Sequence, residues 1–234
     1  MKEFLKSAAV ERSVVLDDKE LALINRQTLR EMGADELFVF RLAACGNKVD
    51  RDFERFTDGA LEKMAELFVG KPVLQDHKWS SGTQTARVYA AEVESQGDYK
   101  RLVLRCYMPR EGNSETIVAL ESGVLRECSV GLAVGKVICS ICGADQRKAM
   151  CQHFHGREYN GKICHFDLDD PRDCYEVSLV AVPAQSDAGA IKSKRYGINE
   201  SDQDPGADAP DDDLLKLAKA RMELEEKRYG GNES

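Results

Sequence analysis

The feature that most constrains the fold of this chain is a crowding of cysteine and histidine near its middle. Five of the eight cysteines and three of the four histidines lie from Cys139 to Cys174. No apolar run is long enough to span a membrane, and residues 1–18 lack a secretory signal, so we expect a cytosolic protein whose thiols stay reduced. A local cysteine cluster in that setting predicts a metal site rather than a disulfide framework.

The spacing within this segment is C-x2-C, then C-x-H-x-H, then C-H. A C-x2-C pair followed by glycine lets two thiolates face one ion, and a second Cys/His pair completes a tetrahedron around Zn²⁺. We therefore predict a structural zinc site with the ligands Cys139, Cys142, Cys151 and His153. Cys164 is the strongest substitute, and His155 or His165 are weaker ones. The alternatives are free thiols in a loop, an iron–sulfur centre or a redox pair.

Charge divides the chain into regions. There are 33 Lys and Arg against 41 Asp and Glu, a net charge of -8, and seven of the acids lie in 199–213 without a base. The rest of the chain is near neutral, so we expect no nucleic-acid partner and no membrane partner. We divide the sequence into an N-terminal segment with a helix, a β-rich domain with the zinc insert inside it, an acidic disordered linker and a C-terminal helical tail. These regions are 1–35, 36–190 with insert 138–166, 191–213 and 214–234.

Apolar periodicity predicts the secondary structure. Helical spacing predicts helices at 18–32, 57–70 and 114–124. Stretches rich in Val, Leu and Tyr predict strands at 36–46, 71–77, 85–96, 99–109, 125–138 and 173–183. We place the end of the first helix at Gly33 and the N-cap of the third at Ser114. Because strands mostly follow one another directly, we predict an α+β, mainly β fold: a mostly antiparallel β-barrel with flanking helices.

Three polar residues outside the cysteine-rich segment point to nucleophilic chemistry. His77 is the one histidine outside that segment and lies at the end of a predicted strand, while Ser129 and Glu176 lie within strand-like sequence. Singly, each has an ordinary explanation as a surface imidazole, a bonded hydroxyl or a solvent-facing carboxylate. Together they supply a nucleophile, a base and a group that orients the base. Asp76 is a competing orienting residue, and Ser178 is a rival nucleophile.

The motifs around these residues are G-K-P-V-L before His77, R-E-C-S-V-G-L around Ser129 and Y-E-V-S-L-V-A-V-P-A-Q-S-D-A around Glu176. In this order they resemble the prohead (head maturation) proteases of tailed bacteriophages, which are related in fold to the herpesvirus capsid-assembly proteases. The resemblance covers 36–190 and implies a serine endopeptidase on a herpesvirus-protease-like barrel. It makes Ser129 the nucleophile, His77 the general base and Glu176 the residue that orients His77. Leu132 stands where that family has an aromatic residue, and the cysteine-rich insert is a further departure.

The resemblance also implies a place of action. A protease of this kind cleaves scaffold and major capsid-protein segments, and in some cases itself, inside the immature prohead in the host cytoplasm. A homodimer is one candidate assembly. The alternative is a catalytically silent capsid-assembly or scaffold component with a structural zinc site. A zinc hydrolase is a third reading, but it requires an open metal position.

Overall fold

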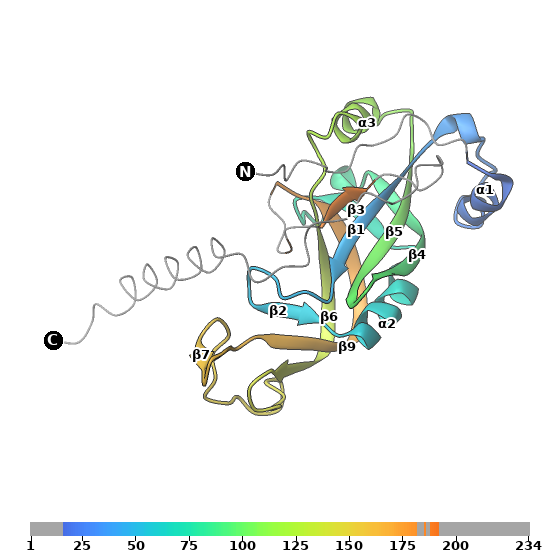
Figure 1. The fold of residues 1–234 in the computed structure, drawn as a ribbon. Helices are drawn as coiled ribbons and strands as arrows, with labels where there is room; N and C mark the ends of the chain where they lie inside the picture. The colour runs from blue at the N-terminus through green and yellow to red at the C-terminus, as the bar shows by residue number, and fades with distance from the viewer. Residues whose placement is uncertain (1–15, 182–184, 186–187, 192–234) are drawn as a thin grey trace. The chain divides into compact units, whose positions relative to one another are not determined.

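The computed structural model describes residues 16–181, 185 and 188–191 (Figure 1). The predicted C-terminal tail, nearly all of the predicted acidic linker and the first fifteen residues lie outside this part of the chain. Within it, no helix combines the length and the apolar character needed to cross a membrane.

The described helices are α1 (Asp18–Asn25), α2 (Asp58–Phe68) and α3 (Ser114–Glu121). The prediction that the first helix continues to Gly33 was wrong. The amide of Asn25 donates to the carbonyl of Met32 and accepts from its backbone N–H, so residues 26–32 fold back as a loop. Gly33 instead precedes a short 3₁₀ turn, η1 (Ala34–Glu36).

The other two helices lie where periodicity predicts them. Thr57 caps α2, because its hydroxyl accepts a hydrogen bond from the N–H of Ala60. The N-cap of α3 is Asn113 rather than Ser114, which is already the first helical residue. A second 3₁₀ turn, η2 (Ser81–Thr83), follows the segment that carries His77.

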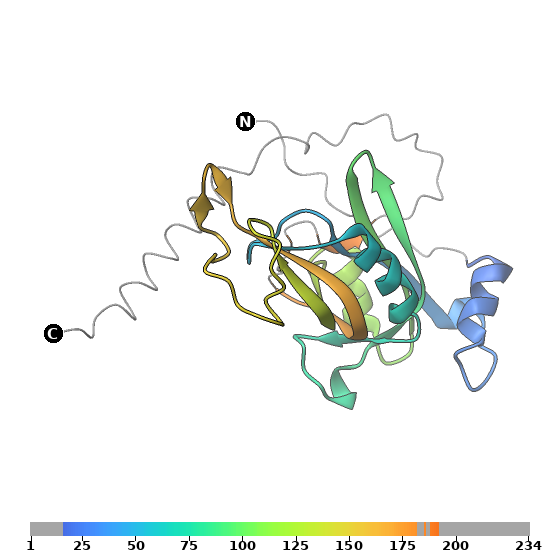
Figure 2. The same ribbon diagram turned by 90° about the horizontal axis from the view of Figure 1, so that it is seen from below.

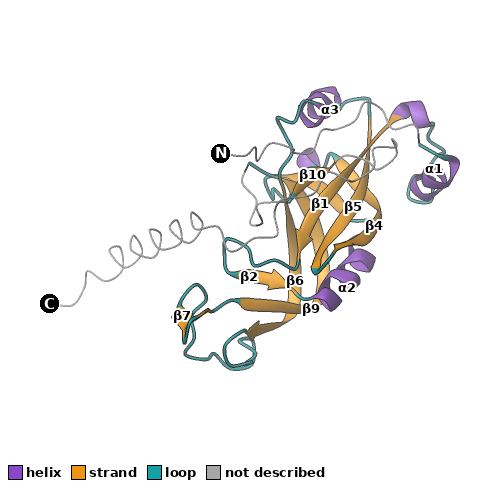
Figure 3. Ribbon diagram, in the orientation of Figure 1, coloured by secondary structure: helices purple, strands orange, loops and turns teal. Residues whose placement is uncertain are grey.

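The strands are β1 (Leu37–Gly46), β2 (Glu54–Phe56), β3 (Pro72–Gln75), β4 (Ala86–Gln96), β5 (Tyr99–Pro109), β6 (Cys128–Cys139), β7 (Glu158–Tyr159), β8 (Lys162–Ile163), β9 (Phe166–Leu179) and β10 (Gly189–Ile191) (Figure 3). β9 begins seven residues before the predicted start at Asp173, in sequence rich in aspartate. Its acids are paired with cations from other segments, which makes them compatible with a strand. The pairs are Arg55–Asp167, Lys63–Asp170 and Lys71–Asp173.

The main sheet has the order β10-β1-β5-β4-β3-β9-β2, and β6 also pairs with β9. It is mixed, because β2 and β3 run parallel to β9 while the other pairs are antiparallel. The predicted barrel is not found, since the described strands form an open sheet. β10 has three residues that pair with β1. Among the described residues it forms no ladder near the start of β6, but Gly189 makes an isolated bridge with Glu127, the residue before β6. The fold is therefore α+β and mainly β.

Alternate residues of the sheet build two apolar clusters. In β1, Phe38 and Phe40 belong to the larger cluster, whereas Leu37 and Val39 belong to the smaller one, as expected for side chains that alternate between faces. α1 joins the smaller cluster through Ile24. The side chains of α2 that join the larger cluster are Ala60, Leu61, Met64 and Phe68. Figure 2 shows β6 and β9 running together from this core toward the insert.

Candidate active site and metal cluster

The parallel pairing of β3 with β9 brings His77 to Glu176. His77 follows β3, and the register pairs Gln75 with Leu179. Nδ1 of His77 lies 2.7 Å from Oε1 of Glu176, whose side chain is 1% exposed, while the His77 side chain is 42% exposed. A buried carboxylate that accepts the Nδ1 proton fixes the tautomer of the imidazole and leaves Nε2 free to act as a base.

The turn that carries His77 has an unusual backbone. Asp76 and His77 have φ angles of 54° and 52°, in the left-handed region that non-glycine residues seldom adopt. The N–H of Asp76 donates to the carbonyl of Leu179, which ties the turn to β9. The Asp76 carboxylate is mostly exposed and pairs with Lys78, so Glu176, not Asp76, contacts the ring.

Ser178 lies beside this pair, but its hydroxyl is not oriented as that of an attacking nucleophile would be. Its side chain is fully buried. Its hydroxyl donates to Oε2 of Glu176 and accepts from the backbone N–H of His77. Because the hydroxyl proton is directed at the carboxylate, the geometry does not favour Ser178 as the attacking group.

Ser129 is placed on the neighbouring strand. In the β6–β9 ladder it lies directly opposite Ser178, and Gly131 lies opposite Glu176. Directly opposed residues share a face of the sheet, so Ser129 and Glu176 project from the same side. Cys128 projects the other way into the larger apolar cluster. Among the described residues, no hydrogen bond joins Ser129 to His77, so the structure pairs two of the three predicted residues and places the third one strand away.

Gly131 makes room for the buried carboxylate. A Cβ at this position would lie 2.2 Å from Oε1 of Glu176. We expect Gly131→Ala to push Glu176 away from His77 and to lower the free energy of unfolding by about 1–3 kcal/mol, measured by urea denaturation. Gly59→Ala is the matched control, because a Cβ there meets nothing within 4 Å. Equal stability of the two variants would show that the carboxylate relaxes freely.

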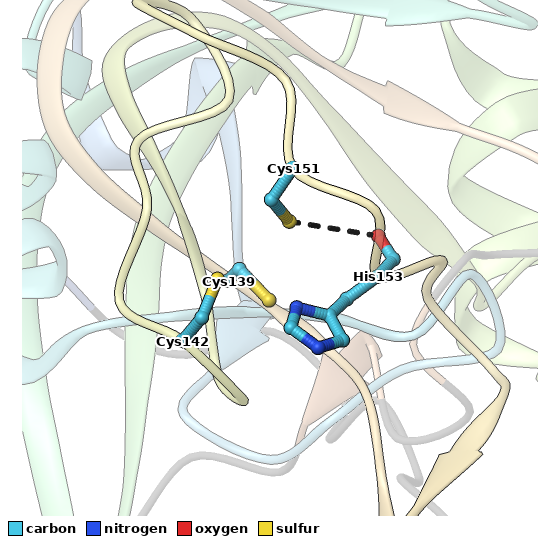
Figure 4. Close-up of side chains that lie close together, drawn as sticks. All are labelled: Cys139, Cys142, Cys151 and His153. Atoms are coloured by element: carbon cyan, nitrogen blue, oxygen red, sulfur yellow. Dashed lines mark hydrogen bonds between the residues drawn. The ribbon is translucent and has the colours of Figure 1, made fainter.

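The four predicted metal ligands form a cluster at the far end of β6. Their ligand atoms all lie within 4.8 Å of one another, and the four residues are Cys139, Cys142, Cys151 and His153. Figure 4 shows these side chains gathered around one point. Gly143, with φ of 73°, follows Cys142 and closes the tight turn by donating its N–H to the carbonyl of Cys139. The cluster can therefore hold a metal ion such as zinc.

The donor atoms of the cluster fit a metal. Nδ1 of His153 is buried without a hydrogen-bond partner among the described residues, and such a nitrogen is satisfied by a cation. A hydrogen bond with the His153 backbone lowers the pKa of the Cys151 thiol to about 6, which favours the thiolate that binds metal. Burial raises the pKa of Cys164 to about 11, although its Sγ lies 3.8 Å from that of Cys139. Cys164 therefore remains the substitute.

The remaining members of the cysteine-rich segment have other surroundings. Cys174 is buried in the larger apolar cluster of the sheet, and burial raises its pKa to about 12. His155 packs edge-on against Phe166. Nε2 of His165 lies 3.4 Å from Oδ1 of Asp167. None of these residues belongs to the four-residue cluster.

Two contacts of Glu176 were not predicted: the sequence suggested Ser178 only as a rival nucleophile, and it suggested no contact between Gly131 and the carboxylate. Ser178 follows Glu176 by two residues, and this period of two in a strand is a signal that both side chains share a face. Gly131 likewise follows Ser129 by two residues. Only the pairing of β6 with β9 shows that the glycine faces the carboxylate.

Comparison with protein families, with characterised proteins and with solved structures finds no match to this chain.

Proposed function

We propose that this chain is a serine endopeptidase of the prohead maturation type. The observation that carries the proposal is the buried Glu176 carboxylate 2.7 Å from Nδ1 of the partly exposed His77. Ser129 lies on the same face of the adjacent strand. A buried acid, an imidazole with a free nitrogen and a nearby hydroxyl are the parts needed for acyl transfer.

In this mechanism Oγ of Ser129 attacks a peptide carbonyl while Nε2 of His77 takes the hydroxyl proton. The imidazolium is stabilised by Glu176 and gives the proton to the leaving amine, and water then hydrolyses the acyl-enzyme. Backbone N–H groups near Gly131 or in the turn 110–113 are candidates for holding the oxyanion. Active sites without substrate are often looser than those with substrate bound. We therefore assign formation of the hydrogen bond between Ser129 and His77 to substrate binding.

The biological setting follows from the motif resemblance. The substrates are scaffold and major capsid-protein segments, with this chain a candidate substrate of itself, inside the immature prohead in the host cytoplasm. We assign a homodimer as the candidate assembly.

The metal in this proposal is a structural Zn²⁺. A set of four ligands leaves no open position for a reacting water, which disfavours a zinc hydrolase. The ion's contribution is to fold the insert, whose small strands β7 and β8 pair only with each other among the described strands. No catalytic step involves the metal.

The test is covalent labelling with a tagged fluorophosphonate. Oγ of an activated serine attacks phosphorus, fluoride leaves, and the base takes the proton. We expect a single adduct on Ser129 by peptide mass spectrometry, and its loss in Ser129→Ala but not in the exposed control Ser95→Ala. Co-expression with the capsid and scaffold proteins of the same phage is expected to show processing that Ser129→Ala abolishes. No adduct together with unchanged processing would refute the proposal.

The second candidate is a catalytically silent capsid-assembly or scaffold component. It is favoured by one observation: within the described part of the chain, Ser129 makes no hydrogen bond to His77. The same experiment separates the two, because a silent component carries no adduct and its Ser129→Ala variant supports assembly unchanged.

A further inference from the structure

The buried carboxylate of Glu176 is held at both oxygens. Oε1 contacts Nδ1 of His77, and Oε2 accepts a hydrogen bond from the hydroxyl of Ser178. Because Glu176 is 1% exposed, water does not readily replace a lost partner, and an unpaired buried carboxylate oxygen is strongly unfavourable. The orientation of the carboxylate toward His77 therefore depends on Ser178.

The same hydroxyl also holds the backbone of His77. The N–H of His77 donates to Oγ of Ser178 at 3.1 Å. The left-handed φ angles of Asp76 and His77 are unfavourable for residues with a Cβ, so this turn needs partners outside itself. One hydroxyl thus contacts both the acid and the segment that presents the base.

We propose that Ser178 is a positioning residue that fixes Glu176 and His77 relative to each other. Its hydroxyl is a donor to the carboxylate and an acceptor for the backbone, a combination that a hydroxyl can supply and an alkyl group cannot. Ser178 does not touch substrate, because it is fully buried. The inference rests on the proposed function where it is tested by the labelling of Ser129, but not where it is tested by the NMR signal of His77.

The test compares Ser178→Ala with Ser178→Thr in the full chain. The first readout is the NMR signal of the Nδ1 proton of His77, identified by its absence in His77→Ala. We expect a downfield, slowly exchanging signal in the unsubstituted chain, its loss in Ser178→Ala and its return in Ser178→Thr. The second readout is the rate of fluorophosphonate labelling at Ser129, expected to fall about 10- to 100-fold in Ser178→Ala and to recover in Ser178→Thr.

Two further variants make the outcome decisive. Thr85→Val removes a buried hydroxyl that has no partner among the described residues, and it is expected to leave both readouts unchanged. Ser178→Cys keeps an unbranched side chain, slightly larger than serine, with only a weak donor, and it takes the place of Ser178→Ala if that variant does not fold. A His77 signal that survives loss of the Ser178 hydroxyl overturns the positioning role. A signal that is lost in a chain never labelled at Ser129 supports the positioning role and refutes the protease proposal instead.

Discussion

Replacing Cys151 with serine is expected to release the metal and to unfold the insert between β6 and β9. Structural zinc contributes on the order of 10 kcal/mol to folding in small metal-binding modules, and the insert has only the two-residue strands β7 and β8 of its own. We expect one zinc per purified chain by elemental mass spectrometry. Loss of one ligand is expected to weaken zinc binding by at least about 100-fold.

Trypsin provides the structural readout for this prediction. The insert carries the cleavable residues Arg147, Lys148, Arg157 and Lys162, which should be protected with metal bound and cut after chelation or in Cys151→Ser. Cys174→Ala is the matched control, because Cys174 lies in the core of the sheet and should retain the metal. Protection that persists without metal would contradict a structural role. Zinc loss in Cys164→Ala but not in His153→Ala would instead make Cys164 the fourth ligand.

The metal cluster was predictable because its geometry is local. Cys139 and Cys142 are brought together by one turn that Gly143 closes, so the spacing alone carries the information. The contact between His77 and Glu176 is different. It depends on β3 running parallel to β9, and nothing in either segment specifies a parallel partner. The sequence motifs name the residues, whereas long-range pairing of strands decides whether they meet.

The errors in the fold have the same origin. The first eight residues of β9 include four aspartates, which are unfavourable in strands when considered alone. Partners from distant segments, such as Arg55 for Asp167 and Lys63 for Asp170, compensate for them. The end of α1 is set by the side chain of Asn25 bonding to Met32, a contact with no helical periodicity. Alternation and periodicity indicate where elements form, but their ends depend on tertiary contacts.

The ladder of β6 and β9 connects the two sites physically. One end of β6 is the candidate metal ligand Cys139, and the other end carries Ser129. β9 starts beside Cys164 and reaches Glu176 near its end. Since residues from Cys139 to Cys128 pair with residues from Phe166 to Leu179, a metal that fixes one end of the ladder also limits slippage at the other.

Glu176→Gln is expected to lower the rate of Ser129 labelling by about 10³- to 10⁴-fold while the chain stays folded. The amide has nearly the same shape as the carboxylate but carries no charge to stabilise the imidazolium, and its NH₂ group can favour the wrong tautomer of His77. Asp76→Asn is the matched control: it makes the same chemical change one residue from His77, on an exposed side chain that pairs with Lys78. Its labelling rate should stay within about threefold of the unsubstituted chain, since surface ion pairs are weak. A large loss of labelling in Asp76→Asn with a small loss in Glu176→Gln would show that Asp76, not Glu176, orients His77. The buried contact between His77 and Glu176 would then be structural only.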